Sequence, residues 1–423
     1  CINILTITIK MKTCPRGEIG RHKGLKILAL LGVPVRVWPR APYKKMLQKK
    51  IILYFFIILA FVSVAYAFNI AITYGSLDFQ YSPSILFTEK INPYKYYLYS
   101  DYSDGIIGAQ YPIYSHATYV LFSVFKYFSW EITKIIWACI NIIFSILIIK
   151  IIISKVKLDK YSAILIACIF FMSTPFRNCL SNGQHTFLIL IAYCGIFFSN
   201  NYIRNFTLGI SYIKYSFMPV LSFFIFFRDG IKGFIISGLF CTFGWVLFSY
   251  YLDENLFTTI FQPVESGLKG FDTTLARGDL YTILNYFGNI FLFSQTKLFT
   301  IIIILLVSLF FGKQISKIKD PVLIFSLLMI VNLFTFGHLI YDYIVLLPIF
   351  IYSIKKINFL NAKLSLIIVL YFWFGLRIFE YAKIYYFTSM SLAPGILENF
   401  INFFMLVFLY FINLNNKDYG NVQ

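Results

Sequence analysis

The chain has 423 residues, of which 59% are hydrophobic and only 13% are charged, and its mean hydropathy is +0.75. Repeated apolar runs of roughly 15–22 residues exclude an ordinary soluble protein and predict a polytopic membrane protein. The formal net charge of +19 does not indicate a nucleic-acid partner, because the first 50 residues hold 12 of the 37 Lys and Arg but one of the 18 acids. The other bases cluster in short loops, as the positive-inside rule predicts.

Residues 1–50 differ from the rest of the chain in composition. They hold four of the 13 Pro, begin with Cys, and include Arg16–Lys26, which resembles the translation of a non-coding RNA gene. We expect this segment to be a gene-model artefact with Met46 as the true start; the alternative is a basic cytoplasmic arm. Residues 51–414 are then a single integral membrane domain and residues 415–423 a cytoplasmic tail.

The membrane spans follow from the apolar runs and the basic clusters that separate them. The first span is Ile51–Ile72, and its backbone must be helical because lipid offers no hydrogen-bond partner. Placing the basic clusters in the cytoplasm leaves five segments outside: Thr73–Ser129, Asn178–Gly183, Asp253–Thr296, Gly337–His338 and Tyr381–Pro394. We therefore expect an all-α protein in the plasma (inner) membrane, multi-pass, with both termini cytoplasmic.

Two choices enter this topology. We interpret Tyr111–Phe128 as an amphipathic helix on the outer surface with Pro112 near its start, because a span there would put the Lys150–Lys160 cluster outside. We interpret Asn205–Phe227 as two short helices that bend near Lys214, because a single span there would put Arg228–Lys232 outside. Each helix alone is too short to cross about 30 Å of hydrocarbon, so we expect the bend to be buried in protein. With both choices the chain has about twelve transmembrane helices.

Asp78 is the first candidate for chemistry. It lies just beyond the first span and before a loop rich in Tyr and Asp. A partly desolvated carboxylate at a membrane surface can take a proton from an acceptor hydroxyl, so Asp78 is a candidate general base. The alternative is an acid that is merely solvated in its loop.

The same predicted loop holds candidates for sugar or acceptor binding: Asn92, Tyr94, Tyr111, Asp101 and Asp104. Aromatic faces stack on sugar rings, while hydroxyl, amide and carboxylate groups bond the sugar hydroxyls. The alternative for the Tyr residues is that they are membrane anchors at the interface. The alternative for Asp101 and Asp104 is that they are solvated loop acids.

Four residues are candidates for binding an anionic phosphate. Gln184 precedes an apolar helix whose free N–H groups favour anions. Lys214 lies in an apolar stretch, Arg277 in the second large loop, and His338 at a turn between two apolar runs. The alternatives are helix capping for Gln184 and His338, snorkelling to the membrane surface for Lys214 and solvation for Arg277.

The sequence has no motif for a nucleotide or a catalytic metal: no Walker A, GxGxxG before a strand, HExxH or GxSxG pattern occurs. The seven Cys form no CxxC pair, and we expect them to serve packing. We expect no cofactor, and a divalent metal requirement stays open. An enzyme of this kind must take its activated substrate from the membrane.

Several of these segments, in this order, resemble glycosyltransferase family 87 of the GT-C superfamily. They are Asp78 with Asn92-Pro93-Tyr94, then Tyr111-Pro112, Asn182-Gly183-Gln184, and Gly209 to Lys214 with Pro219. Gly337-His338, Tyr343 and Leu347-Pro348 resemble the later family motif, although here Asp342 precedes Tyr343 and Ile113 follows Tyr111-Pro112. The resemblance implies a GT-C-like helical bundle with Asp78 as the catalytic base and a polyprenyl-phosphate sugar donor.

We therefore predict an inverting transfer of a mannose-like glycosyl unit to a lipid or glycan acceptor on the outer, periplasmic face. Its partners are the donor, the acceptor and membrane lipids, with no nucleic acid. Two alternatives stay open. A lipid-linked glycan polymerase or ligase also has many spans, and a polytopic transporter or flippase tends to carry inverted repeats and charges near the midplane.

Overall fold

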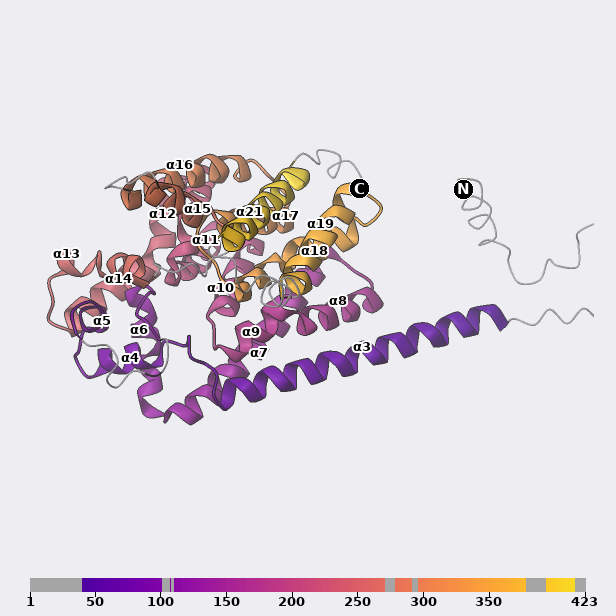
Figure 1. Cartoon of the computed structure of the whole chain (residues 1–423), viewed down its shortest axis with the longest axis horizontal. Helices are drawn as coiled ribbons and strands as arrows, with labels where there is room; N and C mark the ends of the chain where they lie inside the picture. The colour runs from indigo at the N-terminus through magenta and orange to yellow at the C-terminus, as the bar shows by residue number, and fades with distance from the viewer. Residues whose placement is uncertain are drawn as a thin grey trace, which may run out of the picture. The chain divides into compact units, whose positions relative to one another are not determined.

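The computed structural model describes residues 40–100, 107, 110–270, 278–290, 296–377 and 393–414. Backbone contacts divide the chain into two units, Cys1–Tyr54 and Phe55–Gln423. The described part of the first unit is the start of helix α3 (Arg40–Ile72). The second unit contains all the residues of the candidate site, and its elements are labelled in Figure 1.

The described residues form helices and connecting loops, without a strand. After α3 the α-helices are α4 (Tyr81–Thr88), α5 (Pro93–Tyr99), α6 (His116–Phe122), α7 (Trp130–Val156), α8 (Lys160–Met172), α9 (Thr174–Ser181), α10 (Thr186–Tyr193), α11 (Asn201–Ile210), α12 (Met218–Tyr251), α13 (Leu256–Thr259), α14 (Gln262–Gly270), α15 (Leu280–Ile290), α16 (Thr296–Ile315), α17 (Pro321–Thr335), α18 (Leu347–Lys355), α19 (Leu360–Leu370) and α21 (Ala393–Leu414). The short 3-10 or π segments are η2 (Ser123–Tyr127), η3 (Cys194–Phe197), η4 (Ser211–Ile213), η5 (Tyr215–Phe217), η6 (Ile340–Leu346) and η7 (Tyr371–Gly375). The all-α class is confirmed.

Within the described ranges, five helices are long and apolar enough to cross a membrane: Lys49–Ile72, Trp130–Val156, Tyr215–Tyr251, Leu298–Ile315 and Leu397–Leu414. The pair α8 and α9, bent by 58°, gives a sixth candidate. Three shorter apolar helices, of 10–17 residues, reach at most about 26 Å at 1.5 Å per residue and fall short of a full crossing. The chain is thus a membrane protein with five or six candidate spans, and the count of about twelve stays a prediction.

The predicted helix over Tyr111–Phe128 is shorter than expected. The regular helix is α6, which starts at His116, and it continues as the 3-10 segment η2. Residues 111–115 are not helical, because the N–H of Ser115 donates to the carbonyl of Ile213 at 3.0 Å. Most residues of α6 are buried, on more than one side of the helix, and the helix packs against α12. The prediction was wrong about where the helix begins, because a tertiary contact holds Ser115 extended just before α6.

The predicted break at Lys214 is confirmed. Helix α11 ends at Ile210, and Lys214 has an extended backbone (φ −110°, ψ 106°) between η4 and η5. Helix α12 then begins at Met218, with Pro219 in its first turn, where its missing N–H costs nothing. Gly230 within α12 has φ 71°, so α12 itself bends at a residue whose conformation suits glycine.

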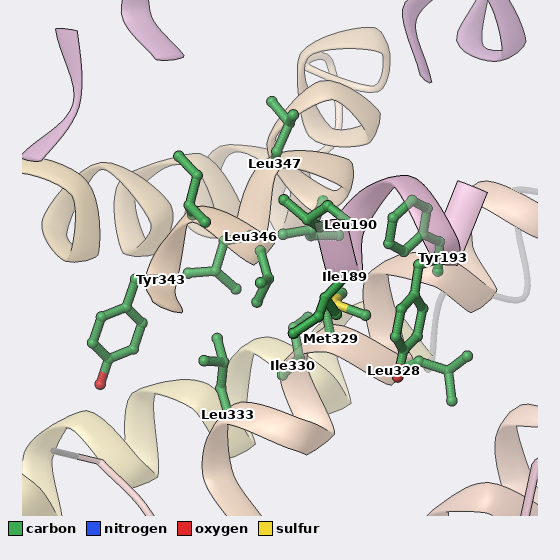
Figure 2. Packing of buried hydrophobic residues seen from close by; sticks show 14 of the residues in the cluster. Ile189, Leu190, Tyr193, Leu328, Met329, Ile330, Leu333, Tyr343, Leu346 and Leu347 are labelled. Carbon is green, nitrogen blue, oxygen red and sulfur yellow. The ribbon is translucent and has the colours of Figure 1, made fainter. Parts of the chain in front are cut away.

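The main core surrounds α17, whose residues Val322–Thr335 are all buried. Figure 2 shows Leu328, Met329, Ile330 and Leu333 of α17 beside α10 residues and the segment running from η6 into α18. In a lipid environment such side chains stabilise the bundle by close van der Waals packing and not by leaving water. This packing fixes the start of α10 and the short helix η6, which both carry residues of the candidate site.

Candidate functional site

The site begins at the loop that follows α3, which lies against the loop between α9 and α10. The N–H of Ser76 donates to the carbonyl of Ser181 at 2.7 Å, and the N–H of Asp78 donates to that of Asn182 at 3.0 Å. Gly75 makes this approach possible, because a Cβ there would lie 2.2 Å from the Ser181 carbonyl oxygen. Two segments distant in sequence are thus held together by backbone bonds.

The side chain of Asp78 contacts Gln184 within this pair of loops. Gln184 Nε2 donates to Asp78 Oδ2 at 2.5 Å, and the Tyr114 hydroxyl donates to Gln184 Oε1 at 3.3 Å. Gln184 is 1% exposed, whereas Asp78 is partly exposed. Gly183 turns the chain here with φ 67°, and its carbonyl accepts from Trp137 Nε1 at 2.8 Å. The amide of Gln184 is therefore fixed on both of its ends.

An aromatic cluster packs against the loop that carries Asp78 and the loop that carries Gln184. Phe79, the neighbour of Asp78, stacks on Trp137 at 4.8 Å and on His185, the neighbour of Gln184, at 5.6 Å between ring centroids. Phe122 contacts the same three rings. His185 is fully buried, and neither of its ring nitrogens has a hydrogen-bond partner among the described residues. We therefore assign His185 to packing that orients Asp78 and Gln184.

A second charged group is centred on Asp342 in η6. Lys214 Nζ donates to both carboxylate oxygens of Asp342 at 2.7 Å, and the Thr186 hydroxyl donates to Oδ1, also at 2.7 Å. His338 Nδ1 lies 2.9 Å from Oδ2, and His338 Nε2 lies 3.2 Å from the carbonyl oxygen of Asn332. The break at Lys214 and the turn at His338 thus meet at one buried carboxylate.

The charges of this group act on Asp78. Burial raises the pKa of Asp78 to about 6, partly opposed by the Gln184 hydrogen bond and the positive charge of Lys214, while Asp342 adds to the increase. Burial also opposes the ionisation of Asp342, but Lys214 and His338 outweigh it and hold the pKa of Asp342 below its usual range. At neutral pH Asp78 is therefore a carboxylate with raised basicity, and Asp342 is a permanent anion.

His338 is buried behind Asp342, with 1% of its surface exposed. Burial lowers the pKa of His338 more than the neighbouring Asp342 raises it. We therefore treat the contact between the two as a hydrogen bond to a neutral imidazole. A direct contact between His338 and a phosphate stays a prediction.

A cavity of 270 Å³ opens beside Lys214. Its walls are mostly apolar and come from the segment before α6, from the start of α12, and from α14, α15 and α16; they include Ile113, Tyr114, Pro219, Tyr281, Leu305 and Phe336. Tyr114 joins the two parts of the site, because it lines the cavity and also donates to Gln184. An apolar cavity that ends at an ammonium group suits an amphipathic anion.

The predicted sugar-binding residues have other contacts in the structure. Asn92 caps α5 and donates to Gln262 Oε1 at 3.0 Å, and Tyr94 is fully buried, with its hydroxyl donating to the Tyr114 carbonyl at 2.6 Å. Tyr111 is 40% exposed, and its ring lies 5.3 Å from that of Tyr97. A sugar contact by Asn92 or Tyr94 stays a prediction and requires these bonds to open.

Asp101, Asp104 and Arg277 lie outside the described residues. Of the other predicted site residues, the structure brings together Asp78, Gln184, Lys214 and His338. Among the residues described, no three His, Cys, Asp or Glu side chains are placed to hold a metal ion.

Sequence reasoning gave no role in the site to three residues of this arrangement: Tyr114, Thr186 and Asp342. The i,i+4 spacing of His338 and Asp342 predicts neighbours on one helix face. In the structure His338 lies in the turn before η6, and the two side chains are in contact. The contacts of Tyr114 and Thr186 with Gln184 and Asp342 join residues 70 and 156 positions apart, which no local pattern reveals.

The family model of glycosyltransferase family 87 matches residues 111–336, just over half of the chain. The matched segment contains Tyr111, Gln184 and Lys214, while Asp78 and Asp342 lie outside it. No curated protein and no solved structure matches the chain. By this match, the chain belongs to glycosyltransferase family 87.

Proposed function

We propose that the protein transfers a hexosyl unit, with mannose as the first candidate, from a polyprenyl-phosphate sugar to a hydroxyl of a lipid or glycan acceptor. The observation that carries the proposal is the position of Lys214. It lies between an apolar cavity and two carboxylates, Asp342 and Asp78, of which Asp78 has a raised pKa. A sugar carried on a lipid phosphate has an apolar tail, an anionic phosphate and a reactive anomeric carbon, in that order. The cavity, Lys214 and Asp78 supply a counterpart for each.

The isoprenoid tail occupies the apolar cavity, and the phosphate reaches Lys214. Among the described residues, the Lys214 ammonium donates two of its N–H groups to Asp342. Its third N–H can then donate to a phosphate oxygen. With Asp78 and Asp342 ionised, Lys214 alone leaves this group with a net negative charge. The donor anion therefore needs a further cation, and Arg277 in the second large loop is our candidate for it.

Asp78 acts as the general base. It takes the proton of the acceptor hydroxyl as the acceptor oxygen forms a bond to the anomeric carbon. The bond from that carbon to the phosphate oxygen breaks, and the polyprenyl phosphate leaves with the electron pair. A single displacement of this kind inverts the anomeric configuration. The phosphate is a stable leaving group, so the step does not depend on a second carboxylic acid.

The positive-inside distribution of Lys and Arg supports a site on the outer face of the membrane. On that face nucleotide sugars are scarce, so a donor carried by the membrane suits the location. Asn92, Tyr94, Tyr111, Asp101 and Asp104 are the candidates for contacting the sugar or the acceptor. The acceptor comes from the lipids or glycans of the same surface.

The test is transfer of radiolabelled mannose from a polyprenyl-phosphate mannose to lipid and glycan fractions by the protein in membrane vesicles. We expect Asp78→Asn to lower the rate about 10²–10⁴-fold, the usual contribution of a general base. Asp253→Asn is the matched control, since Asp253 is exposed and has a positive φ of 54° that Asn also adopts.

Activity of Asp78→Asn equal to that of wild type, at equal expression, would contradict the role of Asp78. Transfer only from a polyprenyl-diphosphate glycan would replace the proposal with a glycan ligase. Topology is tested separately, by labelling a cysteine placed at exposed Tyr74 with an impermeant reagent from each side of the vesicle.

A further inference from the structure

Asp342 is the most highly connected carboxylate among the described residues of the site. It is 2% exposed, and its two oxygens together accept from Thr186, from Lys214 twice, and contact His338. No oxygen of Asp342 is left to receive a proton from an acceptor hydroxyl. The geometry therefore excludes Asp342 as a second general base. Any effect of Asp342 on the reaction must come through the other residues of the site.

The partners of Asp342 come from three separate parts of the chain. Lys214 is the extended residue at the break between η4 and η5, where its N–H donates to the carbonyl of Ser211 at 3.2 Å. Thr186 is the first residue of α10 and lies two positions after Gln184. His338 lies in the non-helical turn between α17 and η6. One carboxylate thus joins the cation of the site to the segment that carries the Asp78 partner.

We propose that Asp342 is a positioning residue for glycosyl transfer: it orients Lys214 toward the donor phosphate and, through Thr186, fixes the start of α10 and Gln184 relative to Asp78. This inference rests on the proposed function. A carboxylate that holds both the phosphate contact and the base contact aligns the two ends of the reacting bond. Misplacement of such groups by about 1 Å can cost roughly 100-fold in rate.

The charge of Asp342 has a second effect that a purely structural bond lacks. The groups that act on Asp78 are the Gln184 amide, the Lys214 ammonium and the Asp342 carboxylate, and Tyr114 and Tyr341 also lie within electrostatic range. Asp342 raises the pKa of Asp78, so removing this anion lowers that pKa. The resulting change is visible in the pH dependence of the reaction and in the titration of Asp78 itself.

The principal test compares Asp342→Asn with Asp342→Glu in the mannose-transfer assay across pH 5–8. We expect Asp342→Asn to lower kcat about 10- to 100-fold and to move the acidic midpoint of the pH profile below that of wild type. Asp342→Glu keeps the negative charge and retains the wild-type midpoint. Asp159→Asn, which alters an exposed helix-capping Asp, is the matched control and changes neither quantity.

A kcat of Asp342→Asn equal to that of wild type overturns the inference. A reduced kcat with an unchanged acidic midpoint of the pH profile also overturns it, because that result indicates loss of structure alone. If Asp342→Asn does not fold, Thr186→Val removes a single hydrogen bond to the same carboxylate. We expect Thr186→Val to lower kcat and Thr186→Ser, which keeps the hydroxyl, to restore it. Unchanged kcat in Thr186→Val is then the contrary result.

A substrate-free measurement separates this inference from the proposed function. Difference infrared titration follows the carboxyl band that disappears in Asp78→Asn. A lower titration midpoint of Asp78 in Asp342→Asn supports the effect of Asp342 on Asp78, whether or not the wild-type protein transfers sugar. Absence of sugar transfer by the wild-type protein would refute only the proposed function. An unmoved midpoint with active wild type refutes the inference about Asp342 alone.

Discussion

Gln184 Nε2 donates to Asp78 Oδ2 at 2.5 Å and joins two residues that lie 106 positions apart in the sequence. The bond stabilises the ionised form of Asp78, whereas burial of this carboxyl favours the protonated form. The balance leaves the pKa of Asp78 at about 6, close to the pH at which a general base works well. The Gln184 amide is therefore the hydrogen-bonding group that opposes the effect of burial on the pKa of Asp78.

Replacing Gln184 by Met tests this balance. Met has a similar length but no N–H donor, so the pKa of Asp78 rises above about 6 and the acidic limb of the rate profile moves to higher pH. Activity at pH 6.5 falls more than activity at pH 8, because a larger share of Asp78 is ionised at the higher pH. Gln314→Met removes the acceptor of the Tyr410 hydroxyl bond far along the chain and is the control. An unmoved acidic limb in Gln184→Met would refute the role of the amide.

Replacing Gly75 by Ala tests the contact between the two loops. The new Cβ would lie 2.2 Å from the Ser181 carbonyl oxygen, a backbone atom, so the loops must separate. We expect a loss of about 1–3 kcal/mol in stability, typical of overpacking, together with a lower kcat because Asp78 moves away from Gln184. Thermal unfolding and the transfer assay give the two quantities.

The control for Gly75→Ala is Gly238→Ala in α12. A Cβ at Gly238 meets only Thr242 Oγ1, at 3.9 Å, and Ala is the better helix former by roughly 0.5–1 kcal/mol. This variant keeps its activity and gains slightly in stability. If Gly75→Ala behaves in the same way, the close approach of the loops is not needed for the site.

Replacing Lys214 by Met tests the buried ion pair. The change leaves Asp342 as a buried charge without its cation, and breaking such a pair costs about 3–5 kcal/mol. We expect the lower end of this range, because the Lys214 side chain is 15% exposed. In the double variant Lys214→Met with Asp342→Asn the unpaired charge is gone, so most of the lost stability returns. Denaturant unfolding of the four proteins of this cycle gives the coupling. A double variant no more stable than Lys214→Met contradicts the expectation.

The sequence predicted the parts of the fold that depend on local pattern. The apolar runs predicted helices and the position of Asp78 after the first of them. Keeping the Arg228–Lys232 cluster in the cytoplasm predicted the break near Lys214, before α12. The start of α6 was predicted wrongly because the Ile213 carbonyl, from a distant segment, holds Ser115 extended. Local pattern carries no information about such a contact.

The site was predictable in part for the same reason. Ionisable residues in apolar surroundings are costly unless they are paired, which singled out Lys214 and His338. Their common partner Asp342 was not identified, because the pairing depends on how α10, the Lys214 break and η6 pack around α17. Likewise, the sequence predicts Asn92 and Tyr94 as sugar or acceptor contacts, whereas in the structure Asn92 caps α5 and the buried Tyr94 hydroxyl bonds the Tyr114 carbonyl.

Asp279 provides a test of stability against pH outside the proposed reaction. It is fully buried at the start of α15, and it accepts from the N–H and the hydroxyl of Thr282 at 2.7 and 3.0 Å. The N–H groups of Gly278 and Asp279 both donate to Asn399 Oδ1, so this helix start is tied to α21. Burial raises the pKa of Asp279 to about 7, and the Thr282 bonds only partly oppose it.

Because the folded protein holds the Asp279 proton more tightly than the unfolded chain does, the resulting stabilisation is complete below about pH 4 and is lost as pH rises through about 7. Asn at this position keeps a cap oxygen and carries no charge. We therefore expect Asp279→Asn to melt at a higher temperature than wild type at pH 8, with a difference that shrinks at pH 5. Asp320→Asn, at an exposed helix cap, shows no such trend. A constant difference between pH 5 and pH 8 would mean that Asp279 does not titrate in this range, because only a group that changes its charge makes stability depend on pH.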